Sequence, residues 1–321
     1  MKAEASPAAS APAGTAARMR TSGALKKIVK HWQLYVIILP PLLYIVIFHY
    51  IPMYGVQLAF KQYRVMEGIT GSPWAGLKHF EQFFSSPSSW RIIGNTLTIS
   101  LYSIAAGFAI PILLAVALNE VRARFFKKTV QMVTYAPYFI STVVLVGMLM
   151  QVLDPRIGIV NQLLGLFGIE PVNFMGKPGM FKSIYVWTGI WQGTGYAAVI
   201  YLAALAGVSK DLQEACVIDG ATKVQRIWHV DLPSIRPTIV ILLVLSFGGV
   251  MNVGFEMIYL MQNNLNISTS EIISTYVYKV GLINSNFSFS TAIGLFNSFI
   301  NLILLATANW AARRYTESSL W

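Results

Sequence analysis

Six long apolar runs constrain the fold of this chain more than any other feature. They lie near residues 34–58, 94–118, 130–153, 183–207, 238–260 and 291–312. An α-helix needs about 20 apolar residues to cross a hydrocarbon layer of roughly 30 Å, and each run is long enough. A spanning segment must also satisfy its own backbone polar groups, which a helix does. The sequence therefore predicts an all-α polytopic membrane protein with six transmembrane helices.

The composition supports this class and argues against a soluble protein. Hydrophobic residues make up 55% of the 321 residues, charged residues only 12%, and the mean hydropathy is +0.58. A soluble domain usually carries about 25% charged residues. The formal charge of +11 does not indicate nucleic acid, because the basic residues flank the apolar runs and form no stripe with aromatic residues.

The distribution of basic residues predicts the orientation in the membrane. If the N-terminus is cytoplasmic, the inside segments hold sixteen of the 24 Lys and Arg residues and the outside segments hold eight. Cytoplasmic loops carry such an excess. We therefore expect both termini to be cytoplasmic. Residues 1–24 are rich in Ala, Ser and Pro and are expected to form a disordered tail, which leaves 25–321 as the transmembrane domain.

Motifs for enzyme chemistry are missing from the sequence. There is no G-x-x-x-x-G-K-[ST] phosphate-binding loop and no G-x-S-x-G. The four histidines, His31, His49, His79 and His229, lack the i, i+4 spacing of a helical metal pair. The single cysteine, Cys216, cannot form a disulfide within the chain and is expected to be a packing residue. We expect neither catalysis nor a metal site.

One polar stretch, Glu214–Pro237, separates the fourth and fifth apolar runs. It is too polar to cross a bilayer, and its Asp219-Gly220 pair predicts a turn. The following Leu232-Pro233 pair is interpreted as the end of the helical pattern. We predict two short helices bent at Gly220. The alternative is a surface helix that lies on its own bundle.

Apolar residues recur through this stretch at i, i+4, i+7 and i+11, which is the spacing of one helix face: Val217, Ala221, Val224 and Trp228. This pattern predicts an apolar stripe that faces something outside the lipid.

The stretch resembles the EAA loop of permease subunits of binding-protein-dependent ABC importers. That pattern runs E-A-A, two residues, D-G-A, a spacer, and then a hydrophobic residue, any residue, L-P and a later Pro. The matching positions are Glu214, Ala215, Cys216, Asp219, Gly220, Ala221, Val230, Leu232, Pro233 and Pro237. Cys216 stands where the pattern has Ala, and Ile227 stands where carbohydrate permeases often have Phe.

Other segments are similar to the LplB-like oligosaccharide and polysaccharide branch of this family. They include WQLYVIILPPLLYIVIFHYIPMYGVQLAFKQY in the first run, NVGFEMIYL in the fifth, EIISTYVYKVGL in the last outer loop, and STAIGLFNSFINLILLATANWAARR at the end. The resemblance implies a type I ABC importer permease fold, with a coupling helix in a cytoplasmic loop at about 208–237, here called the EAA-like loop. It also implies a bacterial inner (cytoplasmic) membrane location.

The resemblance implies partners and roles as well. The partners would be two cytoplasmic ATPase subunits, a second permease in a heterodimer, an extracytoplasmic solute-binding protein and membrane lipid, with no nucleic acid. The chain would bind no cofactor, because the ATPase would use ATP and Mg. The residues implied to couple to the ATPase are Glu214, Ala215, Cys216, Asp219, Gly220, Ala221, Val224, Trp228, Leu232 and Pro233.

The implied substrate is an oligosaccharide, and overall likeness, not any single residue, suggests acidic polysaccharide fragments such as alginate. Polar and aromatic residues inside the runs are candidates for the substrate path, because sugars bind aromatic faces and amide or carboxylate groups. They are Trp187, Trp191, Gln192, Tyr196, Asn252, Glu256, Asn297 and Asn301. The alternative is structural: Asn and Gln join membrane helices, and Trp and Tyr mark the membrane interface.

Two other functions are compatible with a multi-span membrane protein. A secondary transporter driven by an ion gradient is expected to show ionisable residues near midspan and inverted repeats. The other alternative is a non-transporting membrane scaffold. The EAA-like loop favours the importer permease over both, since neither alternative explains it.

Overall fold

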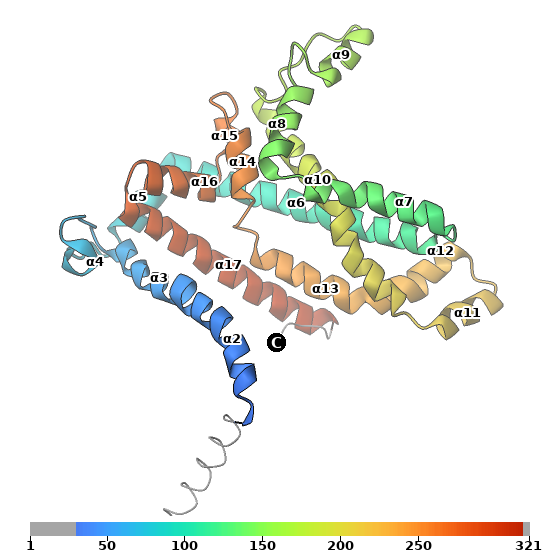
Figure 1. The fold of residues 1–321 in the computed structure, drawn as a ribbon. Coiled ribbons are helices and arrows are strands. Elements are labelled where there is room, and N and C mark those ends of the chain that lie inside the picture. The colour runs from blue at the N-terminus through green and yellow to red at the C-terminus, as the bar shows by residue number, and fades with distance from the viewer. Residues whose placement is uncertain (1–29, 317–321) are drawn as a thin grey trace, which may run out of the picture. The chain divides into compact units, whose positions relative to one another are not determined.

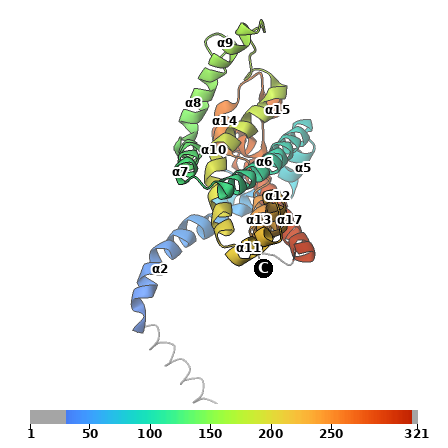
Figure 2. The same cartoon turned by 90° about the vertical axis from the view of Figure 1, so that its right-hand side faces the viewer.

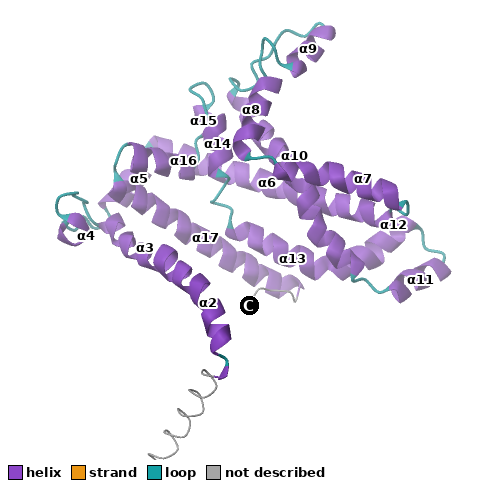
Figure 3. Ribbon diagram, viewed as in Figure 1, coloured by secondary structure: helices purple, strands orange, loops and turns teal. Residues whose placement is uncertain are grey.

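The computed structural model describes residues 30–316, and every regular element in this range is helical apart from one isolated antiparallel bridge between Lys61 and Trp74 (Figures 1 and 3). The described residues form two compact units that divide between Gln57 and Leu58. The expected tail at residues 1–24 lies outside the described residues.

The first unit is built around one continuous helical stretch. It contains α2 (Trp32–Ile45), a π-helical turn η1 (Val46–Tyr50) and α3 (Ile51–Met53), and the 3-10 turn η2 (Tyr54–Phe60) begins at its end. None of the residues of α2, η1 or α3 is buried within the chain. An apolar helix with no buried face is suited to lipid or to a second membrane protein.

The second unit holds the remaining helices. In chain order these are α4 (Gly68–Gly71), α5 (Lys78–Phe84), α6 (Pro87–Glu120), α7 (Arg124–Tyr135), η3 (Ala136–Phe139), α8 (Thr142–Val152), α9 (Ile159–Leu166), α10 (Pro178–Ala206), α11 (Lys210–Ile218), α12 (Lys223–Arg226), η4 (Ile227–Asp231), α13 (Leu232–Gly248), α14 (Phe255–Met261), α15 (Ile267–Ser270), α16 (Ile273–Tyr278), η5 (Lys279–Ile283) and α17 (Phe287–Thr316).

Four helical stretches among the described residues are long and apolar enough to cross a membrane. They are Trp32–Phe60, Pro87–Glu120, Lys223–Gly248 and Phe287–Arg314. Two helix pairs meet the same criteria only together: Arg124–Phe139 with Thr142–Val152, bent by 100°, and Pro178–Ala206 with Lys210–Ile218, bent by 74°. The predicted all-helical, multi-span architecture is confirmed, with four spans, or six if each bent pair is one span.

The core of the second unit forms around α6 and α10, which run side by side (Figures 1 and 2). One apolar cluster joins α6, α10 and α13 through Ala115, Tyr201, Leu205 and Ile235. Two further clusters lie nearer the other end of α6, around Ile99 and around Ile92. The long helices therefore share apolar contacts in three clusters.

Two predicted runs are not single helices, which corrects the sequence analysis. The run 130–153 breaks at residues 140–141, where Ser141 caps the next helix by accepting a hydrogen bond from Val144 N at 3.4 Å. The run 238–260 breaks after Gly248, and a non-helical segment, residues 249–254, leads to α14 (Figure 3). Glycine disfavours the helix interior, and Gly248, Gly249 and Gly254 bracket this second break.

Side chains from other helices satisfy the backbone of the break at 249–254. Ser100 Oγ donates to Val250 O, and Asn301 Oδ1 accepts a hydrogen bond from Met251 N at 2.9 Å. Asn297 Nδ2 donates to Asn252 Oδ1, also at 2.9 Å. Non-helical backbone within a membrane protein needs such partners, because lipid offers none. The break is therefore held by α6 and α17.

Replacing Asn301 with Leu should destabilise the protein. The Asn301 side chain is only 8% exposed, so Asn301→Leu would leave the buried Met251 N–H unpaired, at a cost of about 1–3 kcal/mol. We expect a lower apparent Tm in detergent. Ser298→Ala is the matched control, because Ser298 lies on the same helix and, among the described residues, its hydroxyl bonds only to Gly294 O of its own turn, at 3.0 Å. An Asn301→Leu variant as stable as Ser298→Ala would contradict this role.

Candidate functional site

The turn predicted at Asp219-Gly220 is present and ends α11. The Gly220 N–H bonds to Val217 O at 3.1 Å, and the Ala221 N–H bonds to Cys216 O at 2.9 Å, which is the pattern of a Schellman motif. Gly220 has a φ of 75°, a left-handed conformation that other residues rarely adopt. A Cβ at Gly220 would meet no atom within 4 Å. The backbone conformation alone therefore favours glycine here.

The next helix begins with a capping box that the sequence analysis did not identify. Thr222 Oγ1 accepts a hydrogen bond from Gln225 N at 3.4 Å, and Gln225 Oε1 accepts one from Thr222 N at 2.8 Å. The T-x-x-Q pattern at 222–225 is the signal that could have located this start. The turn and the cap together fix the angle between α11 and α12.

The prediction that Leu232-Pro233 ends this element is wrong. The helix runs on from α12 through η4 into α13, and Lys223–Gly248 forms one candidate span. The Leu232 N–H bonds to Ile227 O, five residues earlier, which makes η4 a π-helical turn. Proline normally clashes with the carbonyl four residues before it, and a widened turn directly ahead of Pro233 relieves that conflict.

The predicted stripe is also corrected, because its four residues do not share one helix. Val217 belongs to α11, Ala221 to the turn, Val224 to α12 and Trp228 to η4. The side chains of Val217, Val224 and Trp228 are nevertheless 65%, 63% and 66% exposed, and Ile218, which was not predicted, is 85% exposed. The EAA-like loop therefore presents apolar side chains that residues 30–316 do not cover.

The polar residues at the start of the loop are exposed as well. Glu214 and Ala215 face solvent on α11, and Glu214 forms no ion pair within residues 30–316. Cys216 is half-buried and free. No residue of α11 is buried. An apolar surface with an unpaired acidic side chain at its edge is typical of a protein interface.

Two of the predicted path residues lie together on α10. Trp187 and Trp191 line a groove of about 420 Å³ with residues of α6, α7 and η3, and both indole rings are more than half exposed. Trp187 Nε1 donates a hydrogen bond to Tyr102 Oη at 2.9 Å. Tyr102 was missed by the sequence analysis, since a single Tyr on a different span carries no local signal. Trp187 and Trp191 therefore offer flat aromatic surface beside an open groove.

Gln192 and Tyr196 fasten α10 to the bend after η3. Gln192 Nε2 donates to Ile140 O at 2.8 Å, next to the break in the third run. The ring of Tyr196 stacks on the ring of Tyr138, with centroids 4.0 Å apart and planes 7° apart. Both Tyr rings are about half exposed. The hydrogen bond of Gln192 therefore has a structural role. The stacked rings of Tyr138 and Tyr196 add further exposed aromatic surface on α10 and η3.

The other four path candidates lie at or near the break between α13 and α14. Asn252 and Glu256 are exposed, and the half-buried Asn297 bonds to Asn252. Asn301 is buried and serves the backbone of the break. Asn252 and Asn297 therefore lie together, and the hydrogen bond of Asn301 has a structural role.

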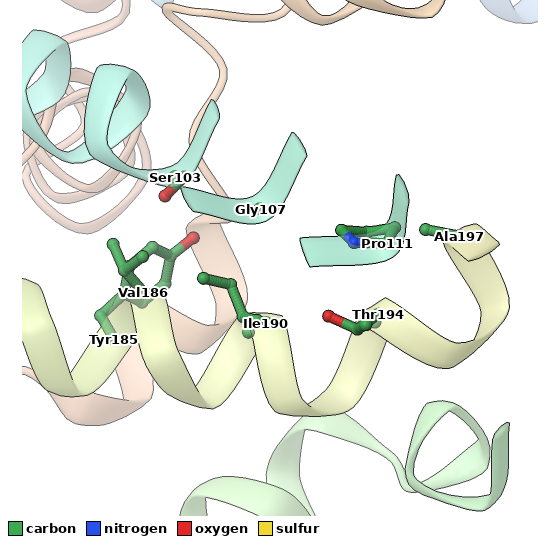
Figure 4. Close-up of a pocket in the computed structure, with 10 residues that line it drawn as sticks. Ser103, Gly107, Pro111, Tyr185, Val186, Ile190, Thr194 and Ala197 are labelled. Carbon is green, nitrogen blue, oxygen red and sulfur yellow. The ribbon is translucent and has the colours of Figure 1, made fainter. Parts of the chain in front are cut away.

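A separate hollow of about 290 Å³ lies between α6 and α10 (Figure 4). Ser103, Gly107 and Pro111 border it from α6, and Tyr185, Ile190 and Thr194 border it from α10 (Figure 4). Close helix approach occurs elsewhere, at Gly195, where a Cβ would lie 2.0 Å from Thr134 O. No local sequence pattern signals this hollow, because its lining comes from two separate helices.

No group of three or more His, Cys, Asp or Glu residues within residues 30–316 lies close enough together to hold a metal ion.

A known family matches most of the chain. The family described as "Binding-protein-dependent transport system inner membrane component" matches residues 107–317, which include the whole EAA-like loop. The match begins within α6 and ends within the last residues of the chain.

Two proteins of Bacillus subtilis are similar over nearly their full length. The polygalacturonan/rhamnogalacturonan transport system permease protein YteP is 40% identical, over 92% of this chain and 92% of that protein. Protein LplB is 38% identical, over 90% of this chain and 91% of that protein.

Two crystal structures show the same fold. A chain of a bacterial ABC transporter involved in the import of the acidic polysaccharide alginate matches with a TM-score of 0.85 and 40% identity, over 91% of this chain and 99% of that one. A chain of a bacterial alginate ABC transporter in complex with an alginate pentasaccharide-bound periplasmic protein matches with a TM-score of 0.85 and 39% identity, over 92% of this chain and 99% of that one.

Proposed function

This chain belongs to the family of binding-protein-dependent transport system inner membrane components, and from this premise we propose that it carries oligosaccharides into the cytoplasm. It is a multi-pass permease of the inner membrane, the transmembrane part of an ABC importer and not its ATPase. The sequence prediction of an importer permease is therefore confirmed.

The proposed substrate is a fragment of an acidic polysaccharide such as alginate. Support comes from the similarity to the permease YteP, a polygalacturonan/rhamnogalacturonan transport protein, and to the chain of the alginate importer. The exposed aromatic pair Trp187 and Trp191 suits a saccharide, since sugar rings pack against flat aromatic faces. Asn252 and Asn297 add amide groups for hydroxyl hydrogen bonds.

The proposed coupling site is the EAA-like loop. The exposed Val217, Val224 and Trp228 would enter a cleft of a cytoplasmic ATPase subunit, and Glu214 would pair with a basic residue there. When ATP draws two ATPase subunits together, α11 would move with them and the bundle would rock between inward- and outward-facing states. The exposed apolar side chains of this loop carry the proposal.

The proposed orientation places the EAA-like loop and both termini in the cytoplasm, where the Lys and Arg excess lies. A second, related permease chain is proposed to form the other half of a heterodimer. The apolar helix α2, none of whose residues is buried in this chain, leaves a surface for such a partner or for lipid. A solute-binding protein would deliver the substrate from outside.

Reconstitution in vesicles tests this function. The chain would be assembled with its second permease, two ATPase subunits and a binding protein, and uptake of labelled alginate oligosaccharide would be followed with and without ATP. We expect uptake only with ATP and with every component present. Uptake driven by an ion gradient with this chain alone, or no uptake in any mixture, would contradict the proposal.

Replacing Trp191 with Ala tests the proposed path. An aromatic contact contributes about 0.5–1.5 kcal/mol, so Trp191→Ala should lower kcat/KM for uptake by roughly two- to tenfold. Trp310→Ala is the matched control, because Trp310 is also more than half exposed but lies on α17. Equal effects of the two substitutions would place Trp191 in lipid contact and not on the path.

A further inference from the structure

Four polar side chains meet where the EAA-like loop joins the long helix α6. Arg226, the last residue of α12, donates through Nη2 to Glu120 Oε1 at the end of α6. Arg226 Nε lies 3.5 Å from Asp231 Oδ2 in η4. Gln213 Nε2 on α11 donates to Asp231 Oδ1 at 3.0 Å. We call Glu120, Gln213, Arg226 and Asp231 the Arg226 cluster.

The Arg226 cluster is shielded from solvent. The side chain of Asp231 is 1% exposed, that of Arg226 19% and that of Glu120 20%. A buried carboxylate is costly unless a cation and hydrogen bonds accompany it. Moving Arg226 away from Asp231 would therefore weaken the pairing of a charge that water cannot reach. The cluster holds its four elements in one arrangement.

The π-helical turn η4 sets the position of Asp231. One extra residue in a helical turn rotates the residues after it by roughly 100° about the axis. Asp231 and Ile235 are both buried, four residues apart on the same face, and Ile235 packs with Ala115 and Leu205. The Arg226 cluster thus lies directly beyond the apolar contact between α6, α10 and α13.

The helix α11 has little else to hold it. No residue of α11 is buried, and its two ends are the connection at 207–209 and the Gly220 turn. The part-buried bond from Gln213 to the buried Asp231 is the side-chain hydrogen bond that ties α11 to the rest of the described chain. Figure 1 shows α11 and α12 together at the end of α6.

We propose that Arg226 is a positioning residue through which movement of α11 reaches α6. This inference rests on the proposed coupling function of the EAA-like loop. Arg226 joins Asp231, which holds Gln213 of α11, to Glu120 of α6. A displacement of α11 then shifts the end of α6 as a unit. Without the cluster, no side-chain bond carries a displacement of α11 to α6, and ATP is hydrolysed without moving the bundle.

The test compares variants of the complete transporter in vesicles. The measured quantities are substrate imported per ATP hydrolysed and the amount of ATPase subunit that copurifies. Arg226→Gln should retain the ATPase subunits and lower the import-to-hydrolysis ratio by roughly tenfold, a typical size for coupling between sites. Arg122→Gln is the matched control, because Arg122 is exposed on the adjacent loop, and its ratio should equal that of the wild type.

A double variant keeps the test decisive if Arg226→Gln folds poorly. Arg226→Gln with Asp231→Asn leaves no unpaired buried charge at Asp231, so the complex should assemble, and its ratio should stay low. A wild-type ratio in an assembled Arg226→Gln or double-variant complex would overturn the inference. So would loss of ATPase binding in both variants. Absence of ATP-dependent uptake by the wild-type complex would instead refute the proposed function.

Discussion

Glu214→Lys is expected to abolish substrate uptake while the chain still inserts into the membrane. Glu214 is exposed on α11 and has no ion-pair partner within the described residues. In the proposed arrangement it faces a basic residue of the ATPase subunit. Like charges brought together at an interface cost several kcal/mol, and each 1.4 kcal/mol is a factor of about ten in affinity. We expect uptake below roughly 1% of the wild-type rate.

Uptake and copurification of the ATPase subunit measure this effect. Glu214→Gln removes the charge without reversing it and should retain part of the uptake. Glu170→Lys is the matched control, because Glu170 is an exposed acid in the loop between α9 and α10 and the substitution changes the net charge equally. Normal uptake by a well-expressed Glu214→Lys protein would show that this carboxylate has no part in coupling.

Gly220→Val should reduce uptake almost as strongly, for a different reason. Gly220 has a φ of 75°, and a residue with a Cβ costs about 1–2 kcal/mol in this region, with more for a β-branched side chain. The added side chain meets nothing within 4 Å, so the effect acts only through the backbone. Relief of the strain would straighten the turn and redirect α11. We expect the uptake rate to fall by roughly tenfold or more.

Asn at the same position makes this prediction specific. Asn adopts the left-handed conformation more readily than other residues with a side chain, so Gly220→Asn should keep most of the uptake. Gly94→Val is the matched control, because a Cβ at Gly94 also meets nothing within 4 Å but the backbone there is helical. If Gly220→Asn fails as completely as Gly220→Val, the conformation of the turn is not what matters.

The sequence located the turn of the EAA-like loop because that feature is local. A positive φ with open space around it leaves glycine as the preferred residue, and Asp219-Gly220 signals the turn without any knowledge of its neighbours. The length and hydropathy of the spans are local as well. These features were therefore predicted, and the multi-span helical architecture is confirmed.

The errors arose where distant residues decide the structure. Leu232-Pro233 was expected to stop the helix, but the π-helical turn before Pro233 relieves the clash. The fifth run was expected to continue through residues 249–254, but Ser100 and Asn301 satisfy its unwound backbone. Ser100 and Val250 are 150 positions apart in the sequence. The hydrophobic periodicity of one segment cannot reveal a hydrogen-bond partner that lies so far away in the sequence.

The candidate site shows the same division. The aromatic residues of α10 could be named from composition, but their partners Tyr102 and Tyr138 lie on other elements. The Arg226 cluster likewise joins Glu120 to Arg226, 106 positions later. From sequence alone, a charged residue in a polar loop is expected to be exposed to solvent. Asp231 was therefore not predicted to be a buried charge.

Crosslinking from α11 tests the central claim most directly. Cys216 is the only cysteine, so Cys216→Ala gives a chain without cysteine, and Ala215→Cys then places one thiol on the exposed surface of α11. In membranes that import substrate, a thiol-reactive crosslinker should join this position to an ATPase subunit. Active membranes in which that thiol is labelled but never reaches an ATPase subunit would contradict the account.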